Sequence, residues 1–179
     1  MDAGPSLLVL TGPAGAGKTT VARRLAETSS ERAVHLHTDD YFAAIKAGYI
    51  APWLPESAAQ NETVTRAILG AASAFATDGF FVVIDGIVGP FRLAVYRAEA
   101  ARLGLGLDYV VLRPSRATAV VRARDRVDSP LADYPPNLFD MFENLGPLEA
   151  NVVDSEVADP AALVEAVGRG VAAGRFRLA

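Results

Sequence analysis

Short apolar runs alternate with longer segments of helical periodicity along most of the chain. The apolar runs are mostly continuous, which is typical of parallel strands that are covered on both faces. Strands are predicted at 6–10, 33–37, 80–85, 108–112 and 151–154. Helices are predicted near 18–28, 57–77, 90–103, 115–126, 136–145 and 160–173. This alternation predicts an α/β fold with an open parallel sheet and helices on both sides.

Local residues support two of the helix starts and leave two segments unassigned. Ser115 can cap the helix that follows it, and Asp159 stands before a proline at the first helical position. The proline-containing segments 47–60 and 126–137 fit neither a helix nor a strand. Loops of this length are often lids or binding segments, and the alternative is two ordinary surface loops.

Composition narrows the class of protein. The chain has 179 residues, 51% of them hydrophobic, which suits one globular domain over residues 1–179. Its net charge of −4, with both signs interspersed, gives no basic surface for nucleic acid or an anionic membrane. No apolar run approaches the ~20 residues that span a bilayer, and the absence of cysteine fits a reducing compartment. We therefore expect a cytoplasmic protein, and composition does not predict its oligomeric state.

Residues 12–19, GPAGAGKT, match the pattern G-x-x-x-x-G-K-S/T between a predicted strand and a predicted helix. In such a phosphate-binding loop, or P-loop, backbone N–H groups surround the phosphates of a nucleotide. Lys18 reaches the β- and γ-phosphates, and the hydroxyl of Thr19 is a ligand for Mg²⁺. We expect Lys18 to face solvent until phosphates bind. The predicted nucleotide-binding residues of this stretch are Gly12, Ala14, Gly15, Ala16, Gly17, Lys18, Thr19 and Thr20.

Aspartates close two predicted strands, at the edge of a parallel sheet where ligands gather. Asp85 ends the strand at 80–85 and is predicted to hold the metal together with Thr19. Asp39 and Asp40 end the strand before it. Asp39 is the candidate base that accepts a proton from a substrate hydroxyl, and the choice over Asp40 stays open. The alternative for each aspartate is a helix cap.

Two histidines, His35 and His37, lie two residues apart on one face of a predicted strand. Such a pair can ligate a metal, but the sequence shows no third ligand. Structural histidines with satisfied hydrogen bonds are the other interpretation.

Arginines end the helix at 115–126, directly before the predicted lid at 122–137. Arg122 and Arg126 are four residues apart and share a helix face. A lid arginine can stabilise charge on a transferring phosphoryl group and exclude water, so Arg126 is a candidate catalytic residue. The alternative is a solvated basic face that is paired with neighbouring aspartates.

Together these motifs resemble the small P-loop kinases, a group that includes chloramphenicol phosphotransferase, gluconate kinase, shikimate kinase and the zeta-toxin kinases. The resemblance covers nearly the whole chain and includes TDDYF, VVIDG and RARDR. It implies a P-loop NTPase fold with three α/β/α layers and a five-stranded parallel sheet in the order 2-3-1-4-5. It also implies that Arg122 stacks on adenine, that Arg126 contacts the ATP phosphates and that Asp154 and Ser155 lie beside the adenine.

The sequence therefore predicts an ATP- and Mg²⁺-dependent phosphotransferase that moves the γ-phosphate to a hydroxyl of a small molecule, an antibiotic or a sugar-like metabolite. The acceptor-side segment is about 40–62, and the candidate pocket residues in it are Tyr41, Phe42, Trp53, Gln60 and Asn61. The alternative for Phe42 and Trp53 is a place in the apolar core. Two alternatives are an ATP-binding or ATP-hydrolysing switch module and a toxin-like kinase. A similarity to bacterial P-loop kinase-like proteins with a related PWLP segment gives no acceptor.

Overall fold

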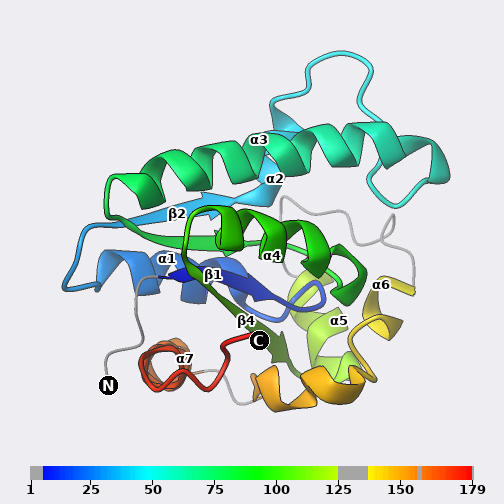
Figure 1. Ribbon diagram of the computed structural model, residues 1–179. Coiled ribbons are helices and arrows are strands. Elements are labelled where there is room, and N and C mark those ends of the chain that lie inside the picture. The colour runs from blue at the N-terminus through cyan, green and yellow to red at the C-terminus, as the bar shows by residue number, and fades with distance from the viewer. Residues whose placement is uncertain (1–5, 125–136, 157–158, 179) are drawn as a thin grey trace.

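A five-stranded parallel sheet lies at the centre of the computed structural model, which describes residues 6–124, 137–156 and 159–178 (Figure 1). The strands lie in the order β2-β3-β1-β4-β5, and each neighbouring pair is parallel. Their bounds are β1 Ser6–Thr11, β2 Ala33–His37, β3 Phe81–Asp85, β4 Gly106–Arg113 and β5 Val152–Asp154. The predicted α/β class and strand order are confirmed.

Helices cover both faces of the sheet and complete three layers (Figure 1). The α-helices are α1 Lys18–Glu27, α2 Thr38–Ala43, α3 Ala58–Thr77, α4 Leu93–Arg102, α5 Arg116–Arg124, α6 Asn137–Asp140 and α7 Pro160–Ala172. Short 3₁₀ helices are η1 Pro55–Ser57, η2 Pro90–Arg92 and η4 Gly146–Asn151. In the part of the chain that the structure describes, no helix is both long and apolar enough to cross a membrane.

Each face of the sheet has its own apolar core. Leu7 and Val9 of β1 pack with residues of α3 and α4, whereas Leu8 and Leu10 pack with residues of α1 and α7. All four side chains are fully buried, which explains the continuous apolar run in the sequence. With both faces covered, the carboxyl ends of the strands are left as the place where polar side chains can meet a ligand.

Both predicted helix caps are confirmed. Ser115 Oγ accepts a hydrogen bond from the N–H of Thr118 at 3.2 Å, before α5. Asp159 Oδ1 accepts one from the N–H of Ala161 at 3.0 Å, at the start of α7. These bonds satisfy N–H groups that a helix start otherwise leaves without partners.

Two local predictions are wrong. The predicted helix at 136–145 ends at Asp140, because the chain turns over 141–143 and the N–H of Phe142 donates to the carbonyl of Phe139. The second strand ends at His37, and Asp39 and Asp40 do not close it: they lie in the first turn of α2, with no side-chain cap.

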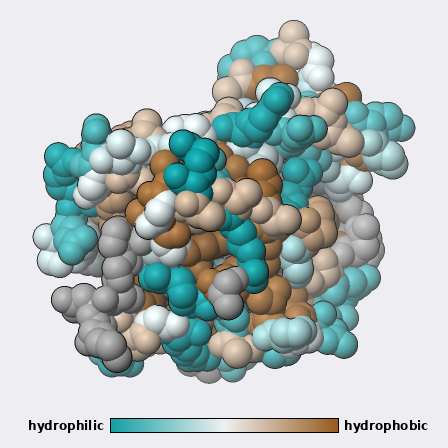
Figure 2. Space-filling model, in the orientation of Figure 1, coloured by the Kyte–Doolittle hydropathy of each residue, from teal (hydrophilic) through white to brown (hydrophobic). Residues whose placement is uncertain are grey.

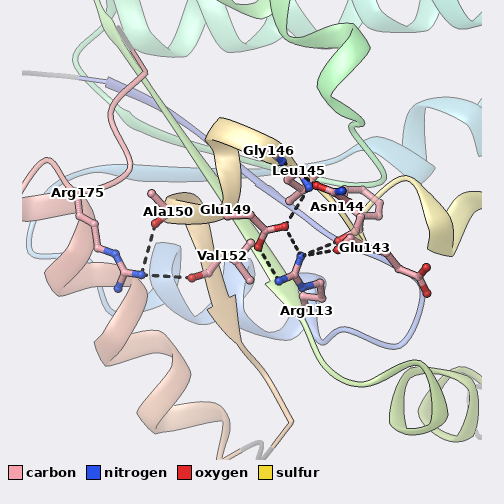
Figure 3. Close-up of polar contacts among 10 residues, drawn as sticks. Arg113, Glu143, Asn144, Leu145, Gly146, Glu149, Ala150, Val152 and Arg175 are labelled. Carbon is pink, nitrogen blue, oxygen red and sulfur yellow. Dashed lines mark hydrogen bonds and ion pairs between the residues drawn. The ribbon is translucent and has the colours of Figure 1, made fainter.

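A polar cluster fixes the segment before β5 against the end of β4 (Figure 3). Arg113 contacts the two carboxylate oxygens of Glu149 at 2.7 and 3.0 Å and donates to the carbonyl of Phe142 at 2.9 Å. The N–H of Leu145 donates to Glu149 Oε1 at 2.9 Å. The Arg113 guanidinium, with this N–H, lowers the pKa of Glu149 to about 2. The charged carboxylate thus anchors the segment to the sheet.

The chain between α2 and α3 projects from the body of the molecule as a loop, drawn in cyan in Figure 1. It forms the lobe at the upper right of Figure 2, where polar and apolar residues mix. Gln60 holds this loop by its backbone: Nε2 donates to the carbonyl of Ile50 at 2.6 Å, and Oε1 accepts from the N–H of Ile50 at 2.8 Å. The predicted acceptor-side segment is therefore tied to the first turn of α3.

Candidate active site

The loop between β1 and α1 carries the predicted phosphate-binding residues Gly12, Ala14, Gly15, Ala16 and Gly17 at the carboxyl end of the central strand. Its three glycines have positive φ angles of 140°, 76° and 90°. Residues with a Cβ rarely adopt such angles, so the glycines make this path of the backbone possible. A loop of this shape can turn several N–H groups toward one anion.

Helix α1 begins where the loop ends. Gly17 is its N-cap in a left-handed conformation, and no side chain caps the helix. The N–H groups of the first turn, at Lys18, Thr19 and Thr20, are therefore left for an anion at the positive end of the helix dipole.

Lys18 differs from the sequence-based expectation of a solvent-facing side chain. It is only 8% exposed, and its Nζ donates a hydrogen bond to the carbonyl of Pro13 at 2.8 Å. The side chain folds back onto its own loop, because the hydrogen bond to the Pro13 carbonyl replaces a hydrogen bond to water that the buried ammonium has lost. A nucleotide phosphate would have to draw it away from Pro13.

Asp85 contacts three side chains of the site, those of Thr19, His35 and His37. It is fully buried at the end of β3 and accepts hydrogen bonds at Oδ2 from the Thr19 hydroxyl, at 2.9 Å, and at Oδ1 from His37 Nδ1, at 2.9 Å. His35 Nε2 contacts the same Oδ1. The register of β2 and β3, with His37 opposite Asp85, brings these groups together.

The charge on Asp85 is stabilised by these contacts. Burial alone would raise its pKa, but the hydrogen bonds from His35 and His37 outweigh burial and hold the pKa well below its usual range. The hydrogen bond with Asp85 in turn raises the pKa of His37, against the effect of burial. The site thus keeps an ionised carboxylate next to the P-loop threonine.

This environment fits a divalent metal ion. The Thr19 hydroxyl and the Asp85 carboxylate are adjacent hard oxygen donors, the type that Mg²⁺ prefers. His35 and His37 also have the satisfied hydrogen bonds of structural histidines. With Asp85 they form a group whose ligand atoms all lie within 4.8 Å of one another, so Asp85 is the candidate third ligand that the sequence spacing did not reveal.

Asp39 lies beside His37, one of the partners of Asp85, because α2 begins directly after β2. The side chain of Asp39 is 64% exposed, and its Oδ2 lies 3.7 Å from His37 Nε2. Gly86 permits this approach, because a Cβ at Gly86 would lie 1.9 Å from Thr38 Oγ1 in the first turn of α2. The residue after Asp85 thus sets how closely α2 can pack.

One cavity of about 1220 Å³ connects these groups. Its lining includes Gly15, Lys18 and Thr19 at the P-loop and both Asp39 and Asp40 on α2. It continues past α2 and the loop before η1 to α3 and the residues after β3. The lining residues there include Phe42, Trp53, Asn61, Thr65, Ile68, Val88, Phe91, Arg92 and Tyr96. A nucleotide-binding loop and an aromatic pocket therefore share one continuous space.

The predicted acceptor-pocket residues divide into two sets. Phe42, Trp53 and Asn61 line the cavity. Tyr41 and Gln60 line a smaller neighbouring hollow instead, and Gln60 uses its amide to hold the loop backbone. Asn61 Nδ2 donates to the carbonyl of Pro52 at 2.7 Å, whereas its Oδ1 has no partner among the described residues.

The predicted adenine-side residues come from three separate segments. Arg122 donates to the carbonyls of Ser155 and Glu156, at 2.7 and 2.6 Å, so it holds the chain after β5. Asp154 is exposed, and its Oδ1 accepts from the N–H of Glu156 at 2.8 Å. Arg126 and most of the predicted lid lie outside the described residues.

Sequence reasoning missed the wall formed after β3 and along α3. Arg92 of η2 donates to Thr65 Oγ1 of α3 at 3.3 Å, and both residues line the cavity. The position of Arg92 seven residues after Asp85, at a strand end, is a pattern that could have indicated it.

A family model supplies the decisive comparison. The model of AAA_33, an AAA domain, matches residues 7–136, which include the P-loop, Asp39 and Asp85. The chain belongs to the AAA_33 family. As a P-loop member of this family it is a nucleotide-binding protein. No curated protein matches the sequence.

Solved structures share the fold over nearly the whole chain. A sugar kinase from Janibacter sp. HTCC2649 is 20% identical, with 93% of this chain and 94% of that one covered and a TM-score of 0.67. A gluconokinase from Sinorhizobium meliloti 1021 is 19% identical, with 96% and 91% covered and a TM-score of 0.58. The tunicamycin resistance protein of Deinococcus radiodurans is 15% identical, with 93% and 95% covered and a TM-score of 0.67. At these identities the likeness shows the fold.

Proposed function

We propose that this AAA_33 protein is an ATP- and Mg²⁺-dependent kinase that transfers the γ-phosphate to a hydroxyl group of a small molecule. The observation that carries the proposal is the single cavity lined by the P-loop lysine, by Asp39 and by an aromatic pocket beyond them. Several structures of similar fold are named as kinases, including the sugar kinase and the gluconokinase. That naming agrees with the proposal.

Each residue has a distinct part in the proposed transfer. Lys18 and the P-loop N–H groups bind the phosphates. Thr19 and Asp85 would hold a magnesium ion, which would neutralise phosphate charge. The acceptor oxygen forms a bond to the γ-phosphorus while the bond from that phosphorus to the bridging oxygen of ADP breaks. Asp39 takes the hydroxyl proton, a role that fits its exposed position in the cavity.

The aromatic pocket favours a kinase over a switch module that only hydrolyses ATP. A switch needs the P-loop and the metal residues but no pocket for a second substrate. The wall of Phe42, Trp53 and Tyr96 provides such a pocket, and its apolar surface would also exclude water from the transfer. A catalytic part for Arg126 remains a prediction.

An acceptor screen tests the proposal. Purified protein with Mg²⁺ and ATP is incubated with hydroxylated sugars, metabolites and antibiotics, and both ADP and phosphorylated product are measured. We expect at least one acceptor to yield product, with a loss on the order of 10²-fold or more in Lys18→Ala.

The other lysine of the chain provides a matched control. Lys46 Nζ also donates to a backbone carbonyl, that of Ala43 at 2.8 Å, but it is exposed and outside the cavity. Lys46→Ala should therefore keep full turnover. ADP release without any phosphorylated product would contradict the kinase proposal, and normal turnover in Lys18→Ala would contradict the assignment of the P-loop.

A further inference from the structure

Arg92 is held in a defined place in the acceptor part of the cavity. Its Nη1 donates to Thr65 Oγ1 at 3.3 Å. Thr65 Oγ1 itself donates to the carbonyl of Asn61 at 2.8 Å, which leaves its lone pairs to accept from Arg92. Thr65 is buried, so it can fix one nitrogen of the guanidinium and leave the other N–H donors of the fork for a ligand.

The charge of Arg92 has no carboxylate partner within 4.0 Å among the described residues. Arg113 and Arg116, by contrast, each form an ion pair with a carboxylate. The described lysines and arginines that line the cavity are Lys18 and Arg92. Because Lys18 is assigned to the nucleotide phosphates, Arg92 is the cation that the described residues offer on the acceptor side.

The surroundings of Arg92 strengthen its attraction for an anion. The buried side chains of Tyr96 and Ile68 line the same part of the cavity, together with Phe42 and Trp53. Apolar walls lower the local dielectric constant, so a charge-assisted hydrogen bond is stronger there than at an open surface. A planar guanidinium matches the two oxygens of a carboxylate or phosphate.

We propose that the acceptor is a hydroxylated small molecule that also carries an acidic group, and that Arg92 binds this group while the hydroxyl faces Asp39. This inference rests on the proposed kinase function and deepens it. Carboxylates and phosphates share the required chemistry, and both are included in the test. Arg92 is assigned to acceptor binding, and Thr65 is assigned as its positioning residue.

Matched pairs of acceptors test the inference. Each pair contains an acid and an uncharged counterpart: gluconate and glucose, glycerol 3-phosphate and glycerol, 4-hydroxybenzoate and its methyl ester. Binding is measured by calorimetry with a non-hydrolysable ATP analogue and Mg²⁺ present, so that the P-loop is occupied, and phosphorylation is measured with ATP. We expect the acid of at least one pair to bind and react at least about 10-fold better than its counterpart.

Variants link the preference to Arg92. Arg92→Gln should raise the KM for that acid on the order of 10–100-fold, with little change in the KM for ATP. Thr65→Val, which keeps the charge but removes its anchor, should raise the acceptor KM by a smaller factor. Arg66→Gln is the control, because Arg66 also donates to a threonine hydroxyl of α3 at 3.3 Å but is exposed and outside the cavity.

The outcomes separate this inference from the kinase proposal. Three results would each overturn the role of Arg92. The first is an uncharged acceptor that reacts as well as its acid counterpart, and the second is that the acids neither bind nor react. The third is an acid preference that persists in Arg92→Gln. The kinase proposal survives the first and third results, because phosphorylated product would still form, and it fails only if the wider screen yields no product.

Discussion

The P-loop glycines differ in what surrounds them, and this difference predicts unequal effects of alanine. A Cβ at Gly15 would lie 2.1 Å from the carbonyl oxygen of Ala119 and 3.1 Å from the backbone nitrogen of Ala123, both in α5. At Gly17 no atom lies within 4 Å of such a Cβ. Both glycines have positive φ, 76° and 90°. An alanine in this left-handed conformation lowers the free energy of unfolding by about 1–2 kcal/mol. Gly17→Ala should therefore lower the free energy of unfolding by only that amount.

Gly15→Ala carries a second cost. Cβ atoms almost never approach other atoms more closely than 3.0 Å, so at 2.1 Å the loop and α5 must separate by nearly 1 Å. Forcing an extra carbon into a packed site costs typically about 1–3 kcal/mol, so the total loss for Gly15→Ala is about 2–5 kcal/mol.

Urea unfolding of both variants measures these losses, and calorimetry with an ATP analogue shows whether the displaced loop still binds nucleotide. If the free energies of unfolding of Gly15→Ala and Gly17→Ala agree within about 0.5 kcal/mol, the close packing of the P-loop on α5 is refuted.

Two further predictions concern the cluster at Glu149 and the start of α2. Because its pKa in the folded state is lowered to about 2, Glu149 stabilises the fold above the unfolded value of about 4.5 and loses this contribution as pH falls toward 2. The difference in unfolding free energy between wild type and Glu149→Gln should therefore shrink between pH 6 and pH 2.5 in denaturant titrations, and a constant difference would contradict the ion pair with Arg113. Gly86→Ala should push Thr38 and α2 away from β3, since the added Cβ would lie 1.9 Å from Thr38 Oγ1. Phosphorylation of the acceptor should then fall, while binding of the ATP analogue is kept. Unchanged phosphorylation would show that the placement of α2 does not matter for transfer.

Much of the fold was predictable because its causes are local. Continuous apolar runs mark strands covered on both faces, and the caps at Ser115 and Asp159 act within three residues. The strand order came from the family resemblance, since spacing along the chain does not determine which strands are neighbours. The helix predicted to 145 failed because the chain turns after Asp140 and is then held by tertiary contacts such as Arg113 with Glu149.

The arrangement of the candidate site residues was predictable where one motif contains them and not where several segments meet. The P-loop, Thr19 and Asp85 follow from contiguous patterns, and Thr19 does contact Asp85. The hydrogen bonds of His35 and His37 depend on the register between β2 and β3, which the sequence does not display. Arg92 and Thr65 are 27 residues apart and meet only in the folded chain. The buried position of Lys18 likewise depends on the folded path of its own loop.

The effect of Asp39→Asn on binding and on transfer tests the central claim most directly. Asparagine keeps the size of the side chain but cannot take a proton, so calorimetry should give nearly wild-type affinity for an ATP analogue with Mg²⁺. Transfer of the γ-phosphate to the acceptor found in the screen should fall by about 10²–10⁴-fold. Asp40 lies in the same helical turn and also on the cavity wall, so Asp40→Asn is the matched control, and it should lower the transfer much less. Nucleotide binding lost as fully as in Lys18→Ala, or transfer that is unchanged, would contradict the assignment of Asp39 as the base.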